Sequence, residues 1–111
     1  MITMRHNRRN RGIQGLIVIS ILKVLVRKPM HGYAVFEVLK EIFGEDLPKP
    51  LIYMTLRRLE EGGYVHSEWE TGEKGPARRV YYITEEGRAL LKRKLECVRK
   101  FMDICSRILE L

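Results

Sequence analysis

The segment from Leu16 to Val26 constrains the fold of this chain more than any other part of its sequence. Only Ser20 and Lys23 interrupt its apolar residues, so a helix formed here is apolar nearly all round. Such a helix must be covered on several sides, yet a chain of 111 residues has few other elements to cover it. The segment is too short for a bilayer core, which needs about 20 apolar residues. We therefore predict a single domain whose first helix, roughly 16–27, is covered partly by a second copy of the chain.

Gly and Pro residues divide the following sequence into two further predicted helices, 31–43 and 49–62. Gly12 and Gly15 are expected to lie before the first helix. Apolar residues recur at helical spacing in both later segments. The residues expected to be buried are Val35, Val38, Leu39 and Ile42 in the second helix, and Ile52, Leu56 and Leu59 in the third.

The C-terminal part of the chain predicts a β-hairpin and a long helix. Segments 64–70 and 77–83 are rich in aromatic and β-branched residues and flank a turn with Gly and Pro. We expect Trp69 to pack at the edge of the core, with stacking on a DNA base as the alternative. Arg79 is expected to pair across the strands with Glu68 or Glu70. Thr84 should cap the last helix. Apolar residues spaced by four and three form a heptad seam along it: Leu91, Leu95, Val98, Met102, Cys105 and Leu109.

The positive charge of the chain is concentrated at its N-terminal end. The formal net charge is +7, and residues 1–36 hold seven Lys or Arg and no acid. This imbalance favours a polyanionic partner such as nucleic acid. The basic tail, 1–11, is predicted either to lie in a DNA minor groove or to act only as a solubilising tail. We expect no membrane association, because no segment of this end combines a basic face with a clean apolar face.

The sequence contains no motif that indicates catalysis or metal binding. No His or Cys pair has metal-ligand spacing, and there is no Walker loop, nucleophile elbow or paired carboxylate motif. Cys97 and Cys105 would lie roughly 12 Å apart on one helix, too far for a disulfide, so we expect free thiols in a reducing cytoplasm. His31 is expected to act structurally at a helix start. We therefore predict no enzymatic activity, no cofactor and no metal.

Three helices followed by a hairpin is the order of a winged helix-turn-helix, whose third helix enters the DNA major groove. Several motifs, in matching order and spacing, resemble the PadR-like transcriptional regulators, and the likeness spans roughly Gly15 to Leu91. The motifs are His31-Gly32-Tyr33, Ile52-Tyr53, Leu56-Arg57-Arg58-Leu59-Glu60-Glu61-Gly62, Ser67-Glu68-Trp69, Gly75-Pro76 with Arg78-Arg79, Tyr81-Tyr82, and Thr84-Glu85-Glu86-Gly87. The chain departs from the family pattern at Lys49-Pro50-Leu51 and at Gly63. Its length resembles the small subgroup with a single C-terminal helix.

This resemblance implies a mainly α (α+β) protein with a two-stranded wing and a long C-terminal dimerisation helix. It divides the chain into a tail (1–11), a winged-helix DNA-binding domain (12–84) and the dimerisation helix (85–111). It also implies a homodimeric repressor of a palindromic operator, in which the first and last helices form the interface. The residues predicted at that interface are Leu16 and Ile19, together with the heptad seam of the last helix.

Residues predicted to contact double-stranded DNA lie mainly on the third helix, where Arg pairs with guanine or phosphate and Tyr binds phosphate. They are Lys49, Leu51, Tyr53, Arg57 and Arg58, joined by Tyr33 from the second helix and by Lys74 and Arg78 from the wing.

A hydrophobic effector is a further prediction, at Phe101, Met102 and Ile104; plain interface packing is the alternative there. Two rival functions are a general architectural DNA-binding protein and a winged helix that binds another protein.

Overall fold

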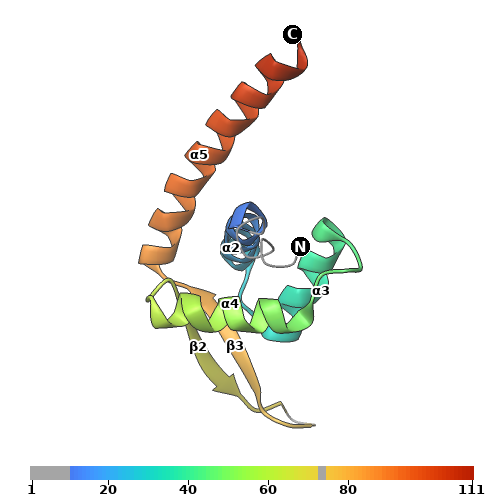
Figure 1. Cartoon of the computed structure of the whole chain (residues 1–111). Coiled ribbons are helices and arrows are strands. Elements are labelled where there is room, and N and C mark those ends of the chain that lie inside the picture. The colour runs from blue at the N-terminus through green and yellow to red at the C-terminus, as the bar shows by residue number, and fades with distance from the viewer. Residues whose placement is uncertain (1–10, 73–74) are drawn as a thin grey trace.

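The computed structural model describes residues 11–72 and 75–111. Its elements, in chain order, are α2 (Arg11–Arg27), β1 (Met30–His31), α3 (Gly32–Phe43), α4 (Lys49–Glu61), β2 (Val65–Glu70), β3 (Arg78–Ile83) and α5 (Glu85–Leu109). In Figure 1 the hairpin extends below α4, whereas α5 projects away in the opposite direction. The predicted order of helices and hairpin is confirmed. The tail up to residue 10 lies outside the described part of the chain.

The described residues form one antiparallel sheet with the strand order β1-β3-β2. The hairpin register pairs Val65 with Ile83 at its base and Glu70 with Arg78 towards its tip. Strand β1 adds a third strand to the predicted two, because His31 pairs with Val80. The short β1 therefore joins the start of α3 directly to the wing.

The core is built around α2, which packs against α3, α4, β3 and α5. Its most deeply buried side chains come from four elements: Ile17, Ile21, Leu22 and Leu25 of α2, Val35 and Leu39 of α3, Ile52 and Leu56 of α4, and Val65 of β2. The stripe predicted for α4 is confirmed, since its third member, Leu59, is only 6% exposed. Within residues 11–72 and 75–111, no helix has the length and apolar character needed to cross a membrane.

Two details of the predicted helices were wrong. The first helix already includes Gly12 and Gly15, because α2 starts at Arg11. Extension of an existing helix adds one hydrogen bond per residue, which offsets the helix penalty of about 1 kcal/mol for each Gly. In α3, Val38 and Ile42 are exposed, and Phe36 is buried in their place. The apolar arc of α3 is wider than the surface that α2 and α4 cover.

The junction between the wing and α5 is tightly packed. Thr84 Oγ1 accepts a hydrogen bond from the Gly87 N–H over 3.0 Å and donates to the Gly63 carbonyl over 2.7 Å. The predicted cap is therefore confirmed. A Cβ atom on Gly87 would collide with the carbonyl oxygen of Tyr64 and with the side chain of Ile83. Glycine is therefore required here to allow α5 to approach the hairpin.

Replacing Gly87 by Ala should lower the free energy of unfolding by about 1–3 kcal/mol, the usual cost of overpacking. The clash is with backbone, so a rotamer change cannot relieve it. Urea denaturation followed by circular dichroism measures the decrease. Arg88→Ala, at the exposed neighbouring position, is the matched control and should change stability by less than about 0.5 kcal/mol. Equal stability of the Gly87 variant and the wild type would contradict the packing argument.

Much of the second half of α5 extends beyond the rest of the described domain. Its large apolar side chains are mostly exposed, with Phe101 at 66% and Met102 at 62%. The radius of gyration is 15.9 Å, larger than the roughly 13 Å expected for a compact domain of this length. The chain is elongated because this helix extends beyond the core.

Candidate nucleic-acid interface

The outer face of α4 is the centre of the candidate site. Pro48 and Pro50 set the extended entry and first turn of this helix. The buried stripe of α4 packs into the core, which leaves Tyr53, Met54 and Arg57 on the outer surface. Tyr53 and Arg57 are one turn apart and so share one face. Among the described residues no salt bridge engages Arg57, whose guanidinium is thus available to an anionic partner.

The start of α3 packs directly against this face. A Cβ atom on Gly32 would come within 2.5 Å of Tyr53 Cε1, so only glycine lets the Tyr53 ring lie against the first turn of α3. Lys49 Nζ lies 5.2 Å from the ring centroid of Tyr33, a cation–π distance. A hydrogen bond to Glu37 and the negative charge of that carboxylate raise the pKa of the Tyr33 phenol. The structure therefore brings Lys49, Tyr33 and Tyr53 together at one end of α4.

A groove of about 480 Å³ separates this helix face from the sheet. Its lining residues are His31, Gly32, Tyr33, Tyr53, Trp69, Arg78, Arg79 and Tyr81. They come from β1, α3, α4 and both hairpin strands, so the groove joins the exposed helix to the wing. Of the predicted DNA-contact residues, Tyr33, Tyr53 and Arg78 meet here.

His31 lies between α3 and the wing, with one ring nitrogen directed at each. Its Nδ1 accepts a hydrogen bond from the Ala34 N–H over 3.3 Å and caps α3. The expected structural role of His31 at the helix start is thus confirmed. Its other nitrogen, Nε2, lies 3.0 Å from Nη1 of Arg78. No local pattern in the sequence predicts this contact, because the two residues are 47 positions apart and meet only through the β1–β3 pairing.

Two predictions for the wing were wrong. Trp69 is 65% exposed rather than packed at the core edge, because β2 continues beyond the core after Ser67. Arg79 does not pair with Glu68 or Glu70. The register places Arg79 opposite Trp69, and side chains on one strand alternate between faces, so the two glutamates lie on the other side. Instead, the Arg79 guanidinium lies 4.9 Å from the Trp69 ring centroid.

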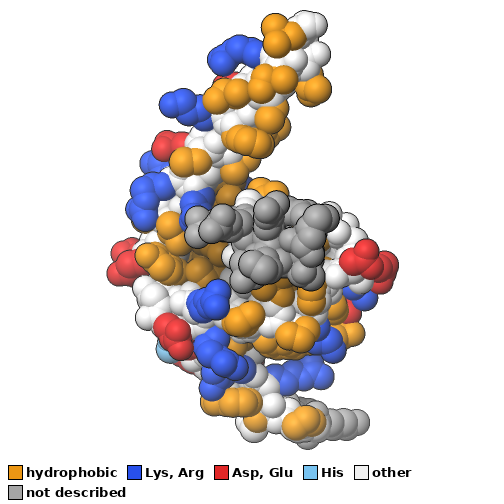
Figure 2. Space-filling view, in the orientation of Figure 1, with side chains coloured by type: hydrophobic (Ala, Val, Ile, Leu, Met, Phe, Trp, Pro, Cys, Tyr) orange, Lys and Arg blue, Asp and Glu red, His pale blue; other side chains and the backbone are white. Residues whose placement is uncertain are grey.

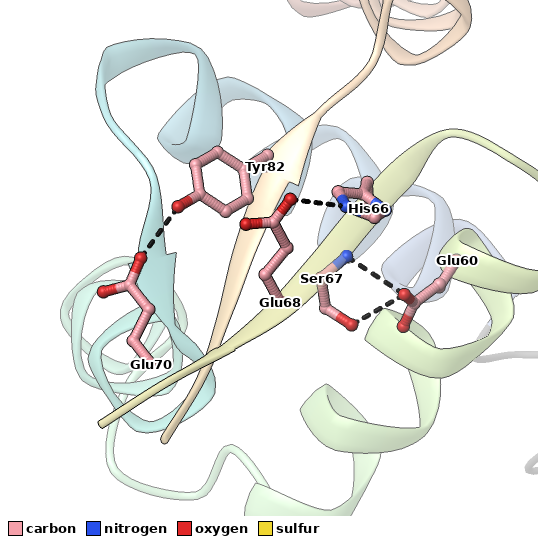
Figure 3. Close-up of polar contacts among 6 residues, drawn as sticks. All are labelled: Glu60, His66, Ser67, Glu68, Glu70 and Tyr82. Atoms are coloured by element: carbon pink, nitrogen blue, oxygen red, sulfur yellow. Dashed lines mark hydrogen bonds and ion pairs between the residues drawn. The ribbon is translucent and has the colours of Figure 1, made fainter. Parts of the chain in front are cut away.

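Glu60 anchors the wing to the end of α4 (Figure 3). Its Oε2 accepts hydrogen bonds from the Ser67 backbone N–H over 3.0 Å and from Ser67 Oγ over 2.6 Å. Its Oε1 lies 3.9 Å from Nη1 of Arg79. On the opposite face of the hairpin, Glu68 contacts His66 and Glu70 accepts from Tyr82. One carboxylate thus sets the position of β2 relative to the helix.

Replacing Glu60 by Ala should lower the free energy of unfolding by about 1–2 kcal/mol, since it removes the acceptor of a part-buried N–H. The measurement is chemical denaturation. Glu61→Ala, which removes an exposed carboxylate from the adjacent position, serves as the control and should be close to neutral. If both variants are destabilised equally, the Ser67 contacts are not the cause.

Three predicted DNA-contact residues are not brought into this group. Leu51 is half-buried and packs against the core. Arg58 is exposed on the side of α4 that faces α2, where it lines a separate groove with Gln14 and Tyr64. Lys74 lies outside the described residues.

Four of the predicted dimer and effector residues line a second groove, of about 530 Å³, between α2 and α5. Leu16, Ile19, Val98 and Phe101 line it. Along the heptad seam, burial decreases towards the C-terminus: Leu91 is buried, Leu95, Val98 and Cys105 are half-buried, and Met102 and Leu109 are exposed. Ile104, the remaining predicted effector residue, is 44% exposed. Both cysteines are free thiols, as predicted.

Comparison with known proteins decides the family. The family model described as "Transcriptional regulator PadR-like family" matches residues 21–93. The chain belongs to the PadR-like family. None of the curated proteins matches the chain.

Solved structures agree with this assignment. A candidate transcriptional regulator from Thermoplasma acidophilum is 37% identical, with a TM-score of 0.80, over 91% of this chain and 97% of that one. A PadR family transcription regulator from Clostridium difficile is 26% identical, with a TM-score of 0.75, over 84% of this chain and 97% of that one. A PadR family regulator from Eggerthella lenta is 28% identical, with a TM-score of 0.77, over 98% of this chain and 92% of that one.

The PadR-like assignment makes this chain a DNA-binding transcription regulator with a winged-helix fold. The helix face and wing groove described above are therefore its candidate DNA interface. In the described residues, no group of three His, Cys, Asp or Glu side chains has the arrangement of a metal site.

Proposed function

We propose that this PadR-like protein is a dimeric repressor that binds a palindromic operator. The observation that carries the proposal is the shared outer surface of α4 and the wing. There Tyr53 and Arg57 lie on a helix free to enter a major groove, and Arg78 lies across the adjoining groove. Arg57 is placed to pair with guanine or phosphate, while Tyr53, Lys49 and Tyr33 contact the phosphate backbone. Arg58 contacts the backbone on the α2 side.

Apart from its arginines, this surface offers few groups that read base edges. Met54, 40% exposed, supplies only an apolar contact, such as one to a thymine methyl. Phosphate contacts and DNA shape therefore carry much of the affinity, and the direct readout is modest.

The dimer forms through α5 and α2. Figure 2 shows hydrophobic side chains along one edge of the projecting half of α5 and Lys and Arg along the other. Exposed Leu16 on α2 and exposed Phe101 and Met102 on α5 supply the apolar surface. Residues 85–111 thus act as the dimerisation helix and 12–84 as the DNA-binding domain. Dimerisation places two α4 helices in successive major grooves, about 34 Å apart.

An apolar effector is a second part of the proposal. Phe101 lines the groove between α2 and α5, and Met102 and Ile104 extend the apolar surface beside it. A ligand held between the α5 helices of a dimer would change their separation and with it the spacing of the two α4 helices. A thermal-shift screen with flat hydrophobic dyes tests this. If no dye raises the melting temperature, these three residues serve only to pack the interface between two copies of the chain.

In vitro selection from random double-stranded DNA, repeated at two salt concentrations, tests the operator. An inverted repeat with half-sites one helical turn apart is the expected result. Enrichment of no sequence, with equal affinity for random DNA, would indicate a general architectural protein instead. No binding at either salt concentration would leave only a protein-interaction winged helix. We propose that the protein binds its operator in the cytoplasm. A reporter gene under the control of that operator should then be repressed.

A further inference from the structure

In the His31 tautomer that keeps the cap of α3, two hydrogen-bond donors face one another in the wing groove. A neutral imidazole has one nitrogen that accepts and one that donates, and a guanidinium has donors only. Of the two tautomers of a neutral ring, only the one with its proton on Nε2 lets Nδ1 accept from the Ala34 N–H and cap α3. Yet Nε2 lies 3.0 Å from Nη1 of Arg78. The two groups cannot satisfy one another while the cap of α3 is kept.

An acceptor that contacts both nitrogens satisfies both donors, and an anionic oxygen does so most strongly. The groove supplies the space, because His31 and Arg78 both line it. Tyr53 borders the same groove, and its ring lies against Gly32, the residue after His31. A DNA phosphate that contacts Tyr53 on α4 would therefore lie next to the His31 and Arg78 donors.

We infer that His31 and Arg78 together clamp one DNA phosphate, with His31 acting as a neutral ligand through its Nε2–H. This inference rests on the proposed DNA interface and adds to it a residue that otherwise only caps a helix. One side chain would then do both tasks: Nδ1 holds the first turn of α3, and Nε2 contacts the backbone of the duplex. Arg78 would supply the positive charge that attracts the phosphate, and the Nε2–H of His31 would fix the direction of the hydrogen bond to it.

Substitutions that keep the cap isolate the second task. Asn and Ser both accept a hydrogen bond at an N-cap position but lack the reach of Nε2. His31→Asn and His31→Ser should therefore melt close to wild type, while operator affinity falls by about tenfold. The slope of log affinity against log salt should stay unchanged, because a neutral donor releases no counterion. In contrast, Arg78→Gln should lower the affinity and reduce the slope by about 0.9, the amount expected when one phosphate is no longer neutralised.

Each alternative gives a different result. If His31 only capped α3, both substitutions would leave operator affinity unchanged, which would overturn the clamp. If His31 only held Arg78 in place, its replacement would reduce the salt slope as Arg78→Gln does, and that result too would overturn it. Arg107→Gln, on the last turn of α5, controls for the removal of one positive charge. Wild-type protein that binds no duplex DNA would overturn the proposed function itself.

The tautomer of His31 provides a test that needs no DNA. Long-range 15N–1H correlation spectra of the free protein should show the proton on Nε2 and the lone pair on Nδ1. A proton on Nδ1 would contradict both the cap and the clamp, whatever the outcome of the binding measurements. A shift of the Nε2 resonance on addition of operator DNA, absent in Arg78→Gln, is the expected sign of a shared phosphate.

Discussion

Replacing Phe101 and Met102 together by Glu should convert the proposed dimer into monomers and weaken operator binding by about a hundredfold or more. The two side chains are 66% and 62% exposed in the single chain, so the change has little effect on the stability of the free monomer. In the dimer the new carboxylates would be buried among apolar groups, at a cost that exceeds the contribution of ordinary interface contacts. The affinity falls because the second half-site no longer binds as part of the same molecule.

Sedimentation equilibrium at micromolar concentration and operator titration should be measured on the same preparation. Arg99 and Lys100 precede this pair on α5, and both are exposed. The double change Arg99→Glu and Lys100→Glu is the control. It adds two carboxylates at neighbouring solvent positions and also removes two cations, so it changes the charge more than the test variant does, yet it should leave the protein dimeric. Wild-type protein that sediments as a monomer would disprove the interface, as would a Phe101 and Met102 variant that stays dimeric.

Replacing Tyr53 and Arg57 together by Ala should weaken operator binding by tens-fold, with folding retained. Arg57 is exposed on the outer face of α4, so its replacement removes interactions with DNA rather than with the core. Tyr53 contributes its ring, which lies against Gly32, and its hydroxyl. Tyr53→Phe keeps the ring and removes only the phosphate donor, so it separates the two contributions. Fluorescence anisotropy with labelled operator DNA measures the affinities.

The salt dependence assigns the interaction made by each residue. Arg57→Ala should reduce the log–log salt slope by about 0.9 if it neutralises a phosphate, and should relax the sequence preference if it pairs with guanine. Tyr53→Phe should lower the affinity with no change of slope. Glu61→Ala, on an exposed position of the same helix, is the control for nonspecific change. Unchanged binding by the double Ala variant would remove α4 as the recognition helix.

Local patterns in the sequence were sufficient to predict most of the fold. Helical spacing identified the stripe of Ile52, Leu56 and Leu59, and the Thr-Glu-Glu-Gly motif identified the cap of α5 at Thr84. These signals depend on residues only a few positions apart. The failures involve surfaces that distant elements cover or leave open. Val38 is 36% exposed because the elements packed on α3 cover its side of the helix only in part.

The candidate site was predicted less completely than the fold, because its geometry depends on strand register. Tyr53, Arg57 and Arg78 follow from helix position and from the family motifs. The position of Arg79 beside Trp69 and Glu60 depends on which residue faces it across the hairpin. A shift of the register by one residue would move every side chain of the strand to the opposite face of the sheet. The contact of His31 with Arg78 depends on β1, a strand of only two residues that has too few positions for a recognisable pattern.

The wing strand β3 and helix α5 are separated by Thr84 alone, and that residue is hydrogen-bonded on both sides. Because Gly87 is packed against the start of the hairpin, this joint has little freedom to bend. The 25 residues of α5 extend about 37 Å, so the helix is a lever arm fixed at the wing. A tilt of about 10° would displace its far end by about 6 Å at that length. In the proposed dimer, small adjustments where the two copies meet would thereby be coupled mechanically to the orientation of the wing.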